Sequence, residues 1–221
     1  MNTLSNFTTQ KPRQLPVIVA VDRSGSMYSD GKIDALNTAL RNFLDSVKKE
    51  TGGRAEINLA IFSFGGTSAT LDLPLSPISM IGEVPVYDAD GLTPMGEAFG
   101  MIKALIEDRD AITSRAYKPT IVLITDGYPN DDWESKMDAL INDGRSSKAF
   151  RMAMAIGDDA DTDMLRSFVS TPEYLVTGES ARDIKKFFRY VTMSVTSRMK
   201  SQTPDQIQVL DYPSDDEELE F

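Results

Sequence analysis

The short stretch 22–26 places one carboxylate and two hydroxyl groups at alternate positions, on Asp22, Ser24 and Ser26. Alternate residues of an extended segment point to the same side, so these three side chains can face one point. Carboxylate, hydroxyl and water oxygens are the ligands that Mg²⁺ prefers, at near-octahedral geometry. The stretch therefore predicts a divalent-cation site, and the structural alternative is a turn that caps a helix.

Two apolar runs are expected to hold carboxylates at one edge of a sheet. The runs 17–21 and 120–125 are typical of strands buried on both faces of a parallel sheet, and they lead into Asp22 and Asp126. In an open α/β sheet, ligand sites lie beyond the carboxyl ends of the strands, where the strand order reverses. In the order 3-2-1-4-5-6 this point lies between the first and fourth strands, so we expect both carboxylates to face one crevice.

Strands and helices alternate along the rest of the chain. Besides the two runs above, we expect strands at 55–64, 69–75, 150–156 and 174–176, and helices at 31–50, 94–116, 132–143, 161–170 and 181–199. This pattern predicts an α/β domain with a doubly wound, mostly parallel six-stranded sheet and helices on both faces. The third strand follows a tight turn, which makes it antiparallel and places it at the sheet edge.

Thr93 precedes a proline at the start of the expected helix 94–116. It is a good N-cap residue there, with Pro94 at the first helical position. The start of this helix can also lie over the crevice between the two carboxylates, where the Thr93 hydroxyl would add a further oxygen. Both interpretations of Thr93 stay open on the sequence alone.

The composition excludes several classes of site. The 221 residues include no cysteine and no histidine, which excludes disulfides, zinc–thiolate sites, cysteine nucleophiles and Ser-His-Asp hydrolysis. The net charge of −11 argues against binding to nucleic acid or to an anionic membrane. No apolar stretch is long enough to span a bilayer and the first residues lack the apolar core of a secretory signal, so we expect a cytoplasmic protein.

We expect three parts along the chain: an N-terminal arm at 1–14, the α/β domain at 15–199 and an acidic tail at 200–221. The tail carries one lysine and seven acidic residues, so it holds −6 of the net −11. Three uses of the tail are open. It is a disordered, solubilising end, or it supplies an acid to the metal site of its own or a neighbouring molecule, or it docks onto another protein with Ser214 as a phosphorylation candidate.

The three loops, in this order, resemble the von Willebrand factor A (VWA) domain over residues 15–199. That family carries a metal-ion-dependent adhesion site (MIDAS) made of an Asp-x-Ser-x-Ser loop, a threonine and a second aspartate. The matching residues here are Asp22, Ser24, Ser26, Thr93 and Asp126. The resemblance implies a Rossmann-like fold in which the three hydroxyls bind the metal directly and at least one aspartate acts through water.

The function that this resemblance implies is binding. With few anionic ligands, a Mg²⁺ or Mn²⁺ ion keeps net positive charge, and an Asp or Glu of a protein partner can complete its coordination. We therefore expect a metal-dependent protein–protein interaction module, an adaptor or scaffold, and not an enzyme. The small form without cysteine looks like the bacterial TerY-like group associated with tellurium-resistance and stress operons, which implies a kinase or phosphatase of the same operon as partner.

The alternative is a Mg²⁺-dependent phosphoryl-transfer or hydrolytic enzyme, because such folds also place aspartates at strand ends beside Mg²⁺. A haloacid-dehalogenase-type phosphatase would need a second aspartate where Ser24 stands. A receiver domain would need a lysine after the fifth strand, where this chain has Gly157 and Asp158. Neither pattern is complete, and no histidine is present to act as a base.

Overall fold

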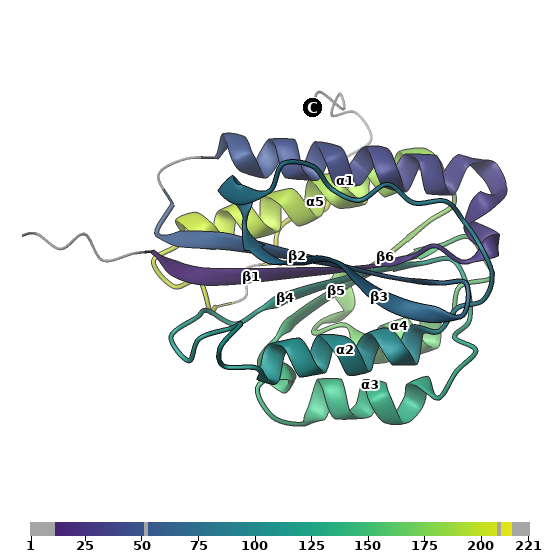
Figure 1. Ribbon diagram of the computed structural model, residues 1–221. Coiled ribbons are helices and arrows are strands. Elements are labelled where there is room, and N and C mark those ends of the chain that lie inside the picture. The colour runs from purple at the N-terminus through teal and green to yellow at the C-terminus, as the bar shows by residue number, and fades with distance from the viewer. Residues whose placement is uncertain (1–11, 51–52, 207–208, 214–221) are drawn as a thin grey trace, which may run out of the picture.

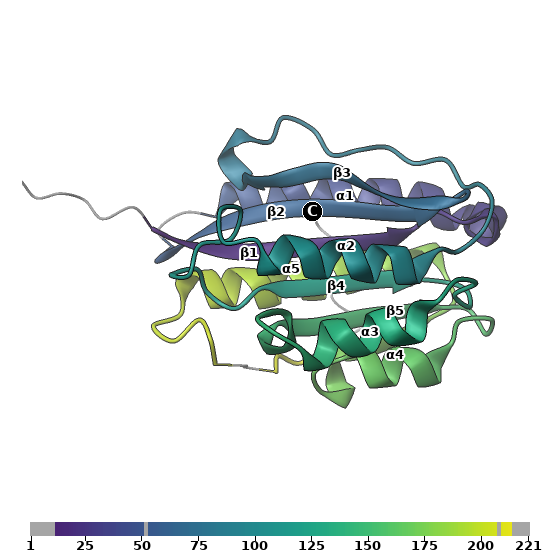
Figure 2. The ribbon, with the colours of Figure 1, turned by 60° about the horizontal axis from the view of Figure 1, so that its bottom comes forward.

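A six-stranded sheet forms the centre of the computed structural model, with the strands in the order β3-β2-β1-β4-β5-β6 (Figures 1 and 2). The strands are β1 (Arg13–Asp22), β2 (Ala55–Gly65), β3 (Ser68–Pro77), β4 (Thr120–Thr125), β5 (Phe150–Ile156) and β6 (Leu175–Gly178). β3 is antiparallel to β2, and the other pairs are parallel. The predicted order and the antiparallel edge strand are confirmed.

The structure describes residues 12–50, 53–206 and 209–213. Most of the expected N-terminal arm and the last eight residues of the expected acidic tail, including Ser214, therefore lie outside the described residues. Within the described part of the chain, no helix is long and apolar enough to cross a membrane.

Helices cover both faces of the sheet (Figure 1). α1 (Lys32–Lys49) and α5 (Ala181–Lys200) lie side by side on one face, and α2 (Met95–Glu107), α3 (Trp133–Asn142) and α4 (Thr162–Phe168) cover the other. Short 3-10 turns form η1 (Gly25–Gly31), η2 (Ile78–Met80), η3 (Ser146–Lys148) and η4 (Pro172–Tyr174). This double cover explains why β1 and β4 read as continuous apolar runs, since neither face of these strands meets water.

Aromatic pairs join the helices on each face. Phe43 of α1 packs against Phe188 of α5 with ring centroids 6.0 Å apart, and Phe99 of α2 stacks on Phe168 of α4 at 5.6 Å. All four rings are buried. The helices are thereby fixed on the sheet, and the loops at the carboxyl ends of the strands extend from a rigid support.

α2 is shorter than the sequence pattern predicts. It ends at Glu107, whereas the expected helix ran to about residue 116. Asp108 leaves the helical conformation, and its carboxylate accepts a hydrogen bond from the Asp110 amide at 2.8 Å, which forms a local turn. Ile112 is nevertheless buried, so the apolar periodicity continued into a segment that is packed but not helical.

The start of α2 also differs from the expectation. Thr93 is not the N-cap; Pro94 occupies that position and makes no side-chain cap. Instead, the Asp131 carboxylate accepts hydrogen bonds from the Gly96 and Glu97 amides at 2.9 and 2.8 Å. Because an acid from a distant loop satisfies these amides, the hydroxyl of Thr93 is not needed as the cap of the helix.

We predict that Asp131→Ala destabilises the fold by about 1 kcal/mol, because two amides in the first turn of α2 lose their acceptor and the helix dipole loses an anion. Urea denaturation monitored by circular dichroism measures the change. Asp132→Ala is the matched control, since Asp132 makes no side-chain cap and accepts from the Ser135 hydroxyl. Equal losses in the two variants would contradict this account of the α2 start.

Candidate metal centre

The end of β1 carries the first three candidate residues. Asp22 is the last residue of the strand, and its Oδ1 accepts a hydrogen bond from the Ser24 amide at 2.7 Å. The Ser24 and Ser26 hydroxyl oxygens lie 3.1 Å apart. Asp22 and Ser24 are buried, whereas Ser26 is exposed. The loop thus turns its oxygens toward one point that is open to solvent on the Ser26 side.

The end of β4 brings the second carboxylate to the same place. The register pairs Val21 with Ile124, so the residues that follow, Asp22 and Thr125, lie across from each other. The Thr125 hydroxyl donates to Asp22 Oδ2 at 2.6 Å, and the Ser26 hydroxyl donates to Asp126 Oδ1 at 2.6 Å. The crevice between β1 and β4 therefore holds both carboxylates, as the strand order predicted.

The loop before α2 is fixed against this crevice by backbone hydrogen bonds. The Gly25 amide donates to Gly91 O at 3.0 Å, and the Leu92 amide donates to Gly66 O at 2.8 Å. A Cβ on Gly91, which has φ +67°, would lie 2.4 Å from the Gly66 Cα, so this close approach requires glycine. The loop thereby has a defined position, and Thr93 lies directly after it.

Thr93 joins the other candidate residues. A Cβ built on Gly127 would lie 3.9 Å from the Ser26 hydroxyl oxygen and 3.9 Å from that of Thr93. Both hydroxyls therefore reach the backbone beside Asp126, and the Thr93 side chain is itself buried. Three loops that are distant in sequence thus converge, and the five sequence-predicted residues lie in one cluster.

A hard divalent cation fits this set of donors. All five side chains offer oxygen, and the two carboxylates bring two negative charges. Across the described parts of the chain, no three or more His, Cys, Asp or Glu side chains are grouped so that they could hold a metal ion, and the present cluster contains only two carboxylates.

Comparison with known proteins decides the family. The profile of the von Willebrand factor type A domain matches residues 17–189, which include all three loops. The chain belongs to the von Willebrand factor type A domain family. Among the curated proteins, none matches this chain.

Solved structures share the VWA fold at low sequence identity. The pilus adhesin SpaC from Lactobacillus rhamnosus GG, in an open conformation, has a TM-score of 0.67 at 16% identity, over 86% of this chain and 31% of that one. The ArnB paralog VWA2 from Sulfolobus acidocaldarius has a TM-score of 0.58 at 13% identity, over 84% of this chain and 45% of that one.

A third similar structure is proximal thread matrix protein 1 from the mussel byssus, solved with a zinc-occupied MIDAS motif. Its TM-score is 0.58 at 19% identity, over 84% of this chain and 46% of that one. The present chain therefore spans less than half the length of each of these three proteins. At these identities the likeness establishes the VWA fold, and members of this family are generally metal-dependent interaction modules.

The electrostatics of the VWA crevice are unfavourable for a lone carboxylate. Burial is the largest influence on Asp22 and raises its pKa, hydrogen bonds from Ser24 and Thr125 lower it, and the negative charge of Asp126 raises it again, so that the pKa stands at about 6. The ionised Asp22 is thus stabilised less well by the protein than by water. A cation in the crevice would relieve this cost.

Two neighbours of the site were not predicted from the sequence. Thr125 orients Asp22, and the Lys32 ammonium pairs with Asp126 Oδ2 at 2.8 Å. Thr125 could have been predicted from the expected strand pairing, because the residue before Asp126 lies opposite Asp22. The position of Lys32 at the start of a helix, where the helix dipole disfavours a cation, could also have indicated that this lysine pairs with an acid elsewhere.

Large exposed side chains occur in the loops that form the crevice. Each of its three loops carries one large exposed residue near the candidate residues, namely Tyr28, Leu92 and Tyr128, with 79%, 59% and 63% of their surface exposed. A polar hollow of about 630 Å³ begins at Tyr128 and Gly157 and continues along the start of α5. We call Tyr28, Leu92 and Tyr128 the apolar rim.

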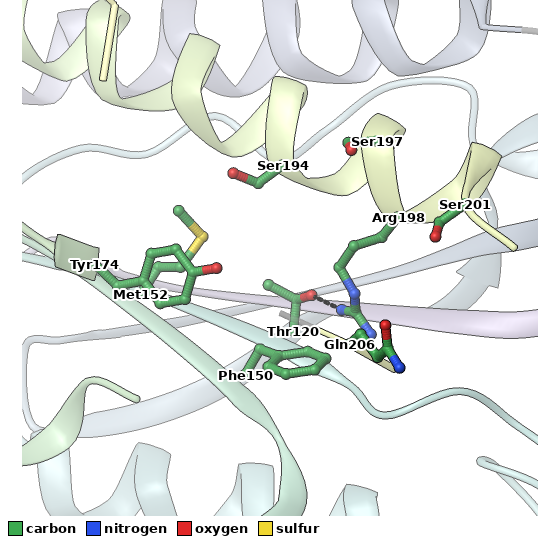
Figure 3. A pocket seen from close by; sticks show the side chains of 9 residues that line it. All are labelled: Thr120, Phe150, Met152, Tyr174, Ser194, Ser197, Arg198, Ser201 and Gln206. Carbon is green, nitrogen blue, oxygen red and sulfur yellow. Dashed lines mark hydrogen bonds between the residues drawn. The ribbon is translucent and has the colours of Figure 1, made fainter. Parts of the chain in front are cut away.

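A second cavity lies at the opposite edge of the sheet, where β4 and β5 begin (Figure 3). Arg198 of α5 extends into it, lies 4.2 Å over the Phe150 ring, and donates to the Thr120 hydroxyl and, at 2.8 Å, to Pro204 O. Ser194 also lines it, with a buried hydroxyl that has no protein partner. At about 20 Å³ the cavity has room for about one water, so we assign it a structural role.

The raised pKa of Asp22 predicts how the free energy of unfolding depends on pH when EDTA keeps the site free of metal. Because the folded-state pKa of about 6 lies above the ordinary aspartate value of 3.8, the contribution of Asp22 is full only below 3.8 and is lost as the pH rises from there through 6. The free energy of unfolding of the parent, relative to Asp22→Asn, should fall by about 2 kcal/mol between pH 4 and pH 7.5. Urea denaturation in EDTA measures this difference, and a difference independent of pH would contradict the burial argument.

Proposed function

We propose that Asp22, Ser24, Ser26, Thr93 and Asp126 form a complete MIDAS that holds a divalent metal. The observation that carries this proposal is the convergence of the five oxygen-bearing side chains from three distant loops. The hydroxyls of Ser24, Ser26 and Thr93 would contact the metal, and the two aspartates would hold water molecules around it or bind it directly. The metal supplies a positive charge that accepts a carboxylate from another molecule.

We propose Mg²⁺ or Mn²⁺ as the resident metal. Both ions favour carboxylate, hydroxyl and water oxygens, which are the donors that this cluster offers. The zinc-occupied MIDAS of the mussel protein supports metal binding at this place in the fold, and it makes zinc the third ion to test.

The site is suited to binding a protein. The Lys32 ammonium offsets one of the two carboxylate charges, so the carboxylates neutralise a bound divalent ion only in part. The metal site then keeps net positive charge and attracts an Asp or Glu of another molecule. The apolar rim, Tyr28, Leu92 and Tyr128, belongs to the three loops that carry the site, and tyrosine is among the residues that contribute most to binding energy in protein interfaces. We propose that a partner inserts one acid and covers the rim.

The wider setting is proposed from the sequence resemblance. We place the VWA domain at 15–199, between an arm and an acidic tail, in a cytoplasmic protein of the TerY-like type that acts in tellurium resistance or stress response. A kinase or phosphatase of the same operon is then the candidate partner. The net charge of −11 supports a protein partner over nucleic acid or membrane.

We predict that Asp22→Ala and Asp126→Ala abolish Mg²⁺-dependent capture of partners while the fold is kept. Each change removes one of the two carboxylates, and the loss of metal affinity should be at least about tenfold, typical of removing a ligand or its support. Tagged protein is incubated with lysate with and without EDTA, captured proteins are identified by mass spectrometry, and Mg²⁺ affinity is measured by calorimetry.

The matched control is Asp159→Ala, which removes an exposed acid outside the cluster and should leave capture unchanged. Equal capture by parent and site variants, or capture that EDTA does not reduce, would contradict the proposal. Mg²⁺-dependent turnover of a generic phosphoester by the pure protein would instead favour the enzyme alternative.

We further propose that the acidic tail ligates the metal of its own molecule. The tail runs back along α5, since the Tyr190 hydroxyl donates to Leu210 O at 3.2 Å and Tyr212 lies against Tyr190, 4.9 Å under the Lys186 ammonium. This direction leads toward the start of α5, at the edge of the sheet that carries the crevice. Eight more residues span up to about 27 Å when extended.

We predict that truncation after Pro213 raises partner capture. If the tail occupies the metal between half and nine-tenths of the time, the gain is about two- to tenfold. The truncation keeps Leu210 and Tyr212, which contact α5, so it should not disturb the fold. A full-length control with Asn and Gln in place of the acids after residue 213 should behave like the truncation, and unchanged capture in both would rule out self-ligation.

A further inference from the structure

Lys32 reaches the crevice from the first turn of α1. Its ammonium lies 2.8 Å from Asp126 Oδ2, the Asp126 side chain is fully buried, and 14% of the Lys32 side chain is exposed. The other oxygen of Asp126 accepts the Ser26 hydroxyl at 2.6 Å. Both oxygens of this carboxylate therefore have partners within the protein.

The position of Lys32 is unfavourable for the helix that carries it. Lys32 is the first residue of α1, where the helix dipole is positive and an anion is preferred. The two preceding residues, Asp30 and Gly31, have φ values of 57° and 68°, in the left-handed region that is uncommon for residues other than glycine, although aspartate enters it more often than most. Such local costs are typical of residues that are held in place for function.

Lys32 changes the charge of the crevice. Asp22 and Asp126 contribute two negative charges, and the Lys32 ammonium returns one positive charge, so the crevice has a net charge of −1. With a divalent ion bound, the net charge becomes +1. Without Lys32 it would be −2 before the ion binds and zero afterwards, and a neutral site attracts an incoming carboxylate less strongly.

We propose that Lys32 is a built-in counter-charge of the metal site, which keeps Asp126 paired, lowers the affinity for the divalent ion and leaves the loaded site positive for the acid of a partner. This inference rests on the proposed metal function and adds a positioning residue to it. In this role Lys32 weakens the binding of the metal and strengthens the attraction of the metal-loaded site for the partner's carboxylate.

The test is calorimetric titration of the full chain with MgCl₂ at fixed pH and ionic strength. Lys32→Gln removes the charge and keeps a hydrogen-bond donor for Asp126, Lys32→Met removes both, and Lys32→Arg keeps both. Lys49→Gln is the matched control, because it removes the same charge at the exposed far end of α1. Lys32→Gln and Lys32→Met should bind Mg²⁺ at least about tenfold more tightly than the parent, with Lys32→Arg and Lys49→Gln within about twofold.

Thermal unfolding gives a second measure. In EDTA, Lys32→Met should melt below the parent, because Asp126 is left buried and unpaired, and Mg²⁺ should raise its melting temperature more than that of the parent. The melting temperature of Lys32→Gln should fall less, since the glutamine amide can still donate a hydrogen bond to Asp126. A variant that is merely damaged would bind the metal more weakly, so tighter binding cannot arise from misfolding.

The result that overturns the inference is Mg²⁺ binding by Lys32→Gln that is equal to or weaker than that of the parent. This failure is distinct from failure of the proposed function. If the parent itself binds no divalent ion, the MIDAS proposal fails; if the parent binds Mg²⁺ and the neutral variants bind it no better, only the role of Lys32 fails.

Discussion

Two carboxylates buried side by side at the ends of adjacent parallel strands set the main constraint on this protein. Asp22 and Asp126 are almost completely removed from water, and burial together with the negative charge of Asp126 raises the pKa of Asp22. Neighbouring groups stabilise both carboxylates. The Ser24 amide and the Thr125 hydroxyl donate hydrogen bonds to Asp22, and the Ser26 hydroxyl and the Lys32 ammonium donate to Asp126. A bound cation would complete the compensation.

The rest of the fold keeps that cluster in position. The double cover of helices fixes β1 and β4, so their carboxyl ends cannot move apart without disturbing the core. The contact between Gly91 and Gly66 fixes the loop before α2, and Asp131 satisfies the first amides of α2. Thr93 is therefore placed by backbone contacts on one side and by a remote acid on the other, while its hydroxyl faces the cluster.

Much of this arrangement could be predicted from the sequence, because it depends on local patterns and on topology. The apolar runs before Asp22 and Asp126 define buried strands, and the strand order then requires the two acids to meet. The end of α2 and its cap could not be predicted, since Asp108 and Asp131 act through hydrogen bonds that no periodicity records. Lys32 lies far in sequence from Asp126, so their pairing depends on the tertiary structure.

Anomalous diffraction from crystals grown with MnCl₂, collected near the manganese absorption edge, shows whether the five residues hold a metal. We expect one strong anomalous peak within coordination distance of the Ser24, Ser26 and Thr93 hydroxyls, with Asp22 and Asp126 around it. Crystals saturated with Mn²⁺ that show no anomalous peak in this crevice, or a peak only elsewhere on the molecule, would contradict this expectation.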